Sequence, residues 1–119
     1  MSASIDSPIE SLNKEFNNTF LRVVDSSLMQ LGENVGSIVY YYLERDYVKR
    51  ADIPTETERF SACLEKIFGK AGEHIMRMMI VERLYVEIEE ELEEVEDYSF
   101  SDYVDDARKR YLQKNRSLL

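Results

Sequence analysis

The stretch AGEHIMRMMIVERLYVEIEEELEEVED, residues 71–97, decides the fold of this chain because its character changes halfway along. Its first half is apolar on nearly all sides, which is typical of a helix buried in a protein core. Its second half keeps only three apolar residues, Ile88, Leu92 and Val95, among eight acidic ones. A single helix of this length would be about 40 Å long. We therefore expect one long helix over residues 71–97, buried at one end and carrying a narrow apolar seam at the other.

The seam in the second half needs a basic partner. Its apolar residues are spaced by four and three, the period of a coiled coil, but the flanking glutamates would repel a parallel copy of themselves. The basic C-terminal helix supplies Arg108, Lys109, Arg110 and Lys114. Two arrangements remain open: the same chain folds back as an antiparallel hairpin, which the short connection favours, or a second subunit donates that helix. The candidate contact residues are Ile88, Leu92, Val95, Arg108, Arg110 and Tyr111.

An amphipathic helix is predicted near the N-terminus, over residues 8–24. Pro8 suits the first turn of a helix and Ser7 can cap it, so residues 1–7 are expected to be frayed. This helix is either a dimerisation helix or a lid that packs on the core, and the sequence does not decide between the two. One face carries Ile9, Leu12, Phe16 and Phe20.

A second helix is expected from about residue 33 to residue 47, with Val35, Ile38, Val39, Tyr42 and Leu43 on its buried stripe. Three consecutive tyrosines cannot all face the core, so Tyr41 is expected at a rim or interface. Tyrosines next to basic residues can also stack on bases and bind phosphates. That alternative uses Tyr41, Arg45, Lys49 and Arg50, but Glu44, Asp46 and Asp52 lie among them and cancel most of the positive field.

Capping residues and breakers divide the rest of the chain into helices. Thr55 with Glu58 predicts a capping box for the third helix, and Gly69 is expected to end it. Ser99 or Ser101 is expected to cap the last helix, whose basic end and tail cover residues 108–119. No segment shows the alternation of a strand. We expect a single domain of residues 1–119, an all-α compact bundle of about five helices.

Composition limits the classes of function. The net charge of −9 argues against a surface that attracts nucleic acid or anionic lipid as a whole. No apolar run approaches the roughly 20 residues that span a bilayer, so no membrane association is expected. The single cysteine, Cys63, and the absence of a signal-peptide pattern predict a cytoplasmic protein.

Motifs for catalysis or metal binding are missing from the sequence. His74 is the only histidine, and one histidine without a cysteine pair or converging carboxylates is a poor metal site. Cys63 lies on the apolar stripe of its helix and is interpreted as a small core residue. No phosphate-binding loop or nucleophile elbow is present. We expect no enzyme activity, no catalytic residue, no metal and no cofactor.

Four segments resemble a known family. Leu31–Val35, Tyr41–Glu44, Phe60–Gly69 and Ile80–Tyr85 follow one another with a spacing similar to that of the archaeal Nitrosopumilus output domain, fifth type. The resemblance covers about residues 25–107 and leaves the helix over residues 8–24 outside. It implies a small helical output or partner-binding role and no defined reaction.

Taken together, the sequence predicts a non-enzymatic interaction or signalling module that acts through helix–helix contacts and self-associates, most simply as a dimer. A transcription-related, nucleic-acid-associated protein is the alternative.

Overall fold

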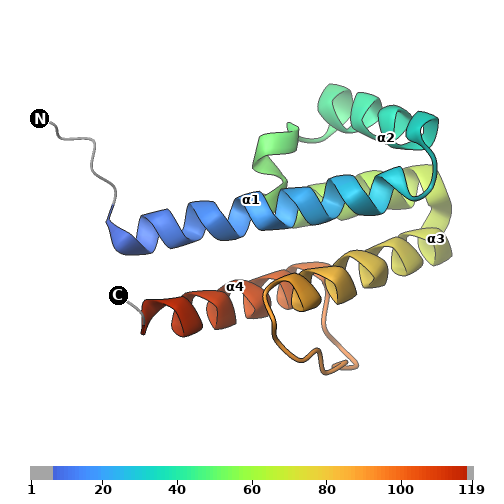
Figure 1. The fold of residues 1–119 in the computed structure, drawn as a ribbon. Helices are drawn as coiled ribbons and strands as arrows, with labels where there is room; N and C mark the ends of the chain where they lie inside the picture. The colour runs from blue at the N-terminus through green and yellow to red at the C-terminus, as the bar shows by residue number, and fades with distance from the viewer. Residues whose placement is uncertain (1–6, 118–119) are drawn as a thin grey trace, which may run out of the picture.

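The computed structural model describes residues 7–117, and this part of the chain is helical without a strand. The elements are α1 (Pro8–Met29), α2 (Glu33–Asp46), the short 3-10 helix η1 (Arg50–Thr55), α3 (Thr57–Glu87) and α4 (Phe100–Arg116). In Figure 1, α1 crosses the middle of the molecule with α2 and η1 above it, and α4 lies below, beside the second half of α3. The all-α fold class is therefore confirmed.

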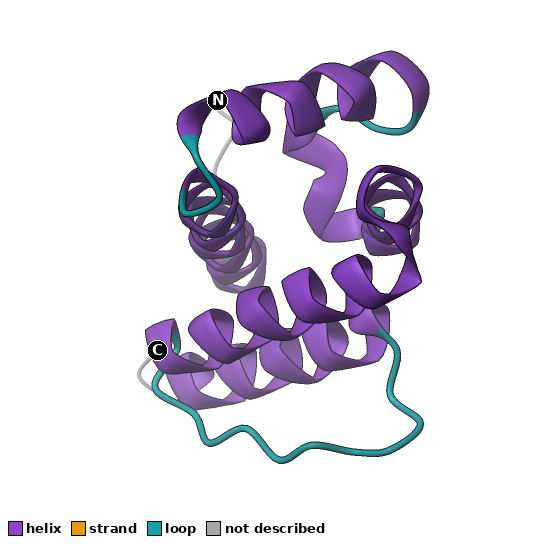
Figure 2. Cartoon of the chain, turned by 90° about the vertical axis from the view of Figure 1, so that its right-hand side faces the viewer, coloured by secondary structure: helices purple, strands orange, loops and turns teal. Residues whose placement is uncertain are grey.

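A sharp turn at Gly69 divides α3 into two rods, residues 57–68 and 70–87. Gly69 has φ 79° and ψ 173°, a backbone conformation that only glycine adopts without strain. Figure 2 shows the first rod nearly end-on and the second running across the view, so the rods point in different directions. Ser61 on the first rod donates a hydrogen bond of 2.7 Å to Glu73 on the second. The prediction that a helix ends at Gly69 is confirmed by this turn.

The helix expected over residues 71–97 is ten residues too long, because α3 ends at Glu87 and residues 88–99 form a loop. A continuing helix would place like charges four residues apart, such as Glu87 with Glu91, and would gather acids at the negative end of its dipole. The loop avoids both penalties and exposes two backbone carbonyls to α4. Lys114 Nζ lies 3.2 Å from Ile88 O and 3.0 Å from Glu89 O. The long acidic helix was therefore a wrong prediction.

Some helix boundaries were predicted correctly and others were not. Ser7 caps α1, and Ser99 caps α4 in a capping box with Asp102, as two of the predictions stated. The expected capping box of Thr55 with Glu58 does not form, because Thr55 belongs to η1 and its hydroxyl donates to Asp52 O. α1 continues to Met29 instead of ending at residue 24. The other residues of the predicted frayed end, 1–6, lie outside the described residues.

The core is filled from every element. Phe16 and Phe20 of α1, Phe60 of α3 and Phe100 of α4 are at most 2% exposed and form a chain of aromatic contacts, with neighbouring ring centroids 6.0–6.4 Å apart. The helix left outside the family resemblance therefore contributes two of the central aromatic side chains. Of the two interpretations of the helix over residues 8–24, the structure shows packing on the core.

Candidate interaction surface on α2

Four side chains form a continuous line on the outer face of α2. Ile38, Tyr41, Tyr42 and Arg45 are spaced by three, one and three residues, which places them on one side of a helix. Ile38 is 51% exposed, Tyr41 61% and Tyr42 40%. We call these four residues the α2 stripe. Three bulky side chains exposed next to one another differ from the scattered exposed apolar residues of an ordinary surface.

The stripe has a defined internal geometry. The rings of Tyr41 and Tyr42 meet edge to face, with centroids 5.3 Å apart. The guanidinium carbon of Arg45 lies 5.4 Å from the centroid of Tyr41 and 4.9 Å from that of Tyr42. Arg45 also donates to both carboxylate oxygens of Asp46, at 2.8–3.1 Å, and this hydrogen bonding raises the pKa of Arg45 and lowers that of Asp46. The cation is thereby oriented beside the two rings.

A close approach of two helices determines which side of α2 faces outward. Gly36 lies against the last turn of α1, where an added Cβ would be 3.6 Å from Leu28 O. Val39 and Leu43 are buried on the same side. The predicted buried stripe is therefore partly wrong, because Ile38 and Tyr42 are rotated to the outside. Gly36, a glycine within the helix, was the sequence signal for the side of α2 that packs against α1.

An ion pair joins α1 to η1, and a tyrosine hydrogen bond attaches α2 to the same carboxylate. Asp25 of α1 accepts hydrogen bonds from the Tyr40 hydroxyl and from Nε and Nη2 of Arg50, the latter two at 3.0 and 2.5 Å. Burial raises the pKa of Asp25, but the hydrogen bonds from Arg50 and Tyr40 outweigh it, and the net pKa is lowered. Burial and the hydrogen bond to Asp25 raise the pKa of Tyr40. Because Tyr40 lies next to the stripe, this contact holds the stripe on a fixed support.

Three of the four candidates on the N-terminal helix are buried within the chain and are not available for contacts with a partner. Leu12, Phe16 and Phe20 are buried in the core and Ile9 is half-buried. Phe16 packs beneath Arg108, whose guanidinium carbon lies 4.6 Å from the ring centroid, and against the ring of Tyr111 at 5.8 Å. Leu12, Phe16 and Phe20 are therefore corrected from interaction residues to buried residues of the chain, whereas Ile9 keeps part of its surface exposed.

The candidates in the acidic segment and in α4 come together within one chain. Ile88 is buried, Leu92 is half-buried and Val95 is exposed, all three in the loop 88–99. Arg110 Nη1 lies 3.2 Å from Glu91 O, and Tyr103 holds the backbone of Val95 through N–H and C=O contacts of 2.9 and 3.2 Å. Within the chain, the basic residues of α4 meet the acidic segment, and the predicted helix–helix seam is replaced by a helix–loop contact.

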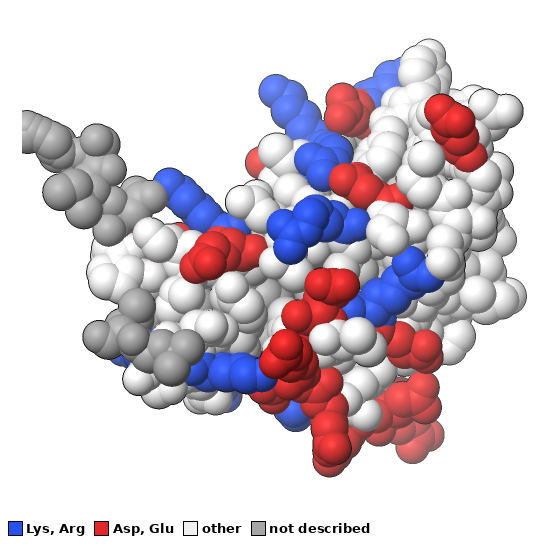
Figure 3. Space-filling view, viewed as in Figure 1, with Lys and Arg blue, Asp and Glu red and all other residues white. Residues whose placement is uncertain are grey.

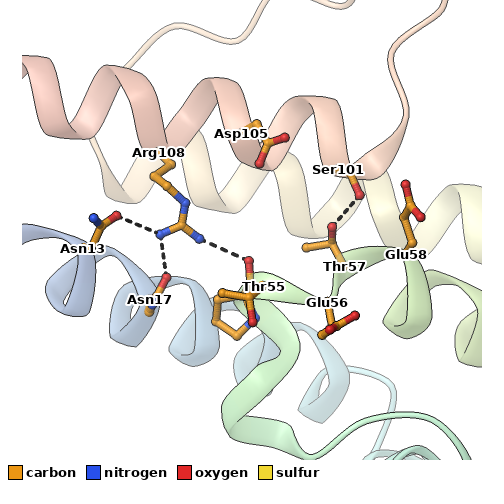
Figure 4. A pocket seen from close by; sticks show the side chains of 10 residues that line it. Asn13, Asn17, Thr55, Glu56, Thr57, Glu58, Ser101, Asp105 and Arg108 are labelled. Carbon is orange, nitrogen blue, oxygen red and sulfur yellow. Dashed lines mark hydrogen bonds between the residues drawn. The ribbon is translucent and has the colours of Figure 1, made fainter. Parts of the chain in front are cut away.

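Arg108 lines a polar cavity of about 680 Å³ between α1, η1, α3 and α4 (Figure 4). Its guanidinium donates to Asn13 Oδ1 at 3.2 Å, Asn17 Oδ1 at 2.7 Å and Pro54 O at 3.1 Å. Burial lowers the pKa of Arg108. Because its three acceptors come from α1 and η1, Arg108 joins α4 to both. The cavity walls also carry Glu56, Glu58 and Asp105, so they offer no concentrated positive charge for an anion.

The cluster for the nucleic-acid alternative has few unpaired cations. Arg45 is bound to Asp46 and Arg50 to Asp25, and Glu44, Asp52 and Glu56 line the same hollow as Lys49. Phosphate binding requires several cations on one face. The geometry of these residues does not favour that alternative.

The side chains that could bind a metal or act as a nucleophile do not form a site in the described part of the chain. Between residues 7 and 117, no group of three or more His, Cys, Asp and Glu side chains is placed to hold a metal ion. Cys63 is buried, and burial, with a smaller effect of Asp46, raises the pKa of its thiol to about 11, opposite to the shift that activates a nucleophile.

Comparison with family models, curated proteins and solved structures finds no match to this chain. Within the described residues, none of the helices combines the length and the hydrophobicity needed to cross a bilayer.

Proposed function

We propose that this chain is a non-enzymatic interaction module that works through helix–helix contacts, and that the α2 stripe is its contact surface. The observation that carries the proposal is the exposure of Ile38, Tyr41 and Tyr42 in one line on α2, whose buried side consists of Gly36, Val39 and Leu43. Tyrosine and arginine are the residue types that most often dominate the energy of protein interfaces.

The support for α2 favours the same function. A surface held in place by the Asp25–Tyr40–Arg50 contact loses little conformational entropy on binding, which leaves more of the contact energy for affinity. The resemblance to output domains agrees with a role in signalling. A cytoplasmic location fits the single free cysteine, which is buried.

Site-specific photo-crosslinking in the native cell tests this proposal. Tyr41 is replaced by a photoreactive phenylalanine derivative, and exposed Lys66 on α3 is replaced in the same way as the matched control. We expect a discrete protein adduct from position 41 and none from position 66. The adduct should weaken when Ile38→Ser is added, because the serine removes the neighbouring apolar contact.

The absence of an adduct from position 41 would overturn the proposal. An adduct that is insensitive to Ile38→Ser would do so as well, because it would not depend on the stripe.

A further inference from the structure

Three side chains on one face of α4 line the polar cavity of Figure 4. Ser101, Asp105 and Arg108 are spaced by four and three residues, so they lie one above another on the helix. Figure 4 places Arg108 at one end of the cavity and the contact between Ser101 and Thr57 at the other, with Asp105 between them. Opposite charges three residues apart can pair on a helix, but Asp105 and Arg108 form no ion pair. The cavity therefore presents a cation and an anion separately to a ligand.

The charge of Arg108 has no partner of opposite sign in the described part of the chain. Its guanidinium donates to the side-chain oxygens of Asn13 and Asn17 and to the carbonyl of Pro54, which are neutral acceptors. These three bonds leave two of the five N–H groups of the guanidinium without an acceptor in the described residues. Burial lowers the pKa of Arg108, and the attraction of Asp105 offsets only part of this effect. A carboxylate from a ligand would stabilise this half-buried cation.

The carboxylates of the cavity wall have the opposite requirement. Asp105 and Glu58 form no ion pair in the described part of the chain, and Glu56 meets only Arg59, at 3.7 Å. An ammonium group can pair with them. Asp105 lies one helical turn from Arg108, so a ligand that pairs with both must carry its two opposite charges close together. An α-amino acid has this geometry, because its ammonium and its carboxylate are attached to the same carbon.

A ligand with charge of only one sign fits the cavity less well. A simple anion meets the carboxylates of the wall and the net charge of −9 on the chain. Figure 3 shows acidic side chains gathered at the lower part of the surface, where Figures 1 and 2 place the loop 88–99. A simple cation meets the guanidinium of Arg108. A zwitterion has no net charge and can pair with both kinds of group in the cavity.

We infer that this cavity binds a free α-amino acid, with the ligand's carboxylate at Arg108 and its ammonium at Asp105. The cavity volume of about 680 Å³ lies within the range of roughly 300–1,000 Å³ that is usual for small-molecule sites. The hydroxyls of Thr57 and Ser101 at the other end favour an uncharged polar side chain on the ligand. The lining residues come from the α1, η1, α3 and α4 region and not from α2, so this site is separate from the α2 stripe and goes beyond the proposed function.

Isothermal titration calorimetry of the full chain with each of the common amino acids, up to about 10 mM, tests the inference. We expect saturable binding by serine, threonine, asparagine or glutamine, with a dissociation constant below about 1 mM. The amino acid that binds is then compared with the amine that lacks its carboxylate and the acid that lacks its ammonium. For serine these are ethanolamine and 3-hydroxypropanoate. Each analogue should bind about tenfold more weakly, because it loses one charged hydrogen bond.

Asp105→Asn separates recognition of the ligand from an effect on the fold. The Asp105 side chain is exposed and makes no hydrogen bond in the described part of the chain, so the free energy of unfolding should not change. Binding of the amino acid should weaken about tenfold, whereas binding of the acid analogue should not weaken, because that analogue has no ammonium. Asp97→Asn is the matched control. It makes the same chemical change at an exposed carboxylate of the loop 88–99 and should leave binding unchanged.

Three results would overturn the inference. The first is the absence of saturable binding by every amino acid, and the second is an analogue that binds as tightly as the amino acid. The third is an equal effect of Asp105→Asn and Asp97→Asn, because the ligand would then lie outside the cavity. The proposed function is tested separately by the crosslink from position 41, which does not depend on the cavity.

Discussion

Replacing Gly69 by alanine tests the turn that folds α3 into two rods. The test depends on whether the substitution lowers or raises the free energy of unfolding. At φ 79° and ψ 173°, an L-residue is strained by about 1–3 kcal/mol. A Cβ at this position would have no heavy atom within 4 Å, so no steric clash adds to the backbone strain. Gly69→Ala should therefore lower the free energy of unfolding by about 1–3 kcal/mol. With a urea dependence of about 2 kcal/mol/M, the unfolding midpoint should fall by roughly 0.5–1.5 M.

Gly36→Ala is the matched control because Gly36 is helical and its added Cβ would make only ordinary contacts, the nearest at 3.6 Å. There the free energy of unfolding should rise by up to about 1 kcal/mol. Both variants are compared with the wild type by urea unfolding followed by circular dichroism. If residues 57–87 formed one continuous helix, Gly69→Ala would stabilise the protein by about 1 kcal/mol as well. A more stable Gly69→Ala variant would thus refute the turn.

Three further predictions concern the core and the nucleic-acid alternative. The Tyr85 hydroxyl contacts Asp106 at 2.5 Å. Burial, followed by this hydrogen bond, raises the pKa of Tyr85 above its unfolded value. The contribution of Tyr85 to the free energy of unfolding is therefore complete below about pH 10 and is lost as the pH rises toward the folded pKa. Tyr85→Phe should lower the free energy of unfolding by about 1–2 kcal/mol at pH 7 and should make it fall less steeply with pH above pH 10. Urea titrations that give the variant and the wild type the same dependence on pH would contradict this. Phe16→Ala should lower the free energy of unfolding by about 3–5 kcal/mol, and loss of association at unchanged stability would contradict its place in the core. Duplex and single-stranded probes at low salt should show no gel shift, whereas a salt-sensitive shift that Lys49→Glu abolishes would favour the alternative.

Local signals in the sequence were sufficient for the helix class and for several helix boundaries. Ser7 with Pro8, Ser99 and Gly69 all act as expected, because a cap or a positive φ depends on the nearest few residues. The end of α1 was missed because Ser27 and Leu28 are buried in the core, so packing carries the helix through a segment with weak helix propensity.

The end of α3 could not be read from periodicity alone. Ile88, Leu92 and Val95 keep a helical spacing, yet the segment leaves the helix because Lys114 and Tyr103, from distant positions, bind its backbone. Those contacts exist only once α4 is docked. The sequence indicated that the basic residues of the last helix meet the acidic segment, but not the backbone conformation of that segment.

The candidate site was only partly predictable. Tyr41 was correctly expected at an exposed position, and it is the most exposed member of the α2 stripe. Ile38 and Tyr42 were expected in the core because helical periodicity does not fix the rotation of a helix by one position. Contact between Gly36 and the end of α1 fixes that rotation, and it is visible only in three dimensions.

Amide chemical shifts of the full chain, recorded alone and with the protein captured by crosslinking at position 41, test the central claim most directly, because they locate the contact surface residue by residue. The account predicts shift changes along residues 33–46, largest near Ile38 and Tyr41, and unchanged shifts in the loop 88–99 and along α4. Shift changes in the loop or in α4 while α2 stays unchanged would contradict it, as would a spectrum that the captured protein leaves unchanged.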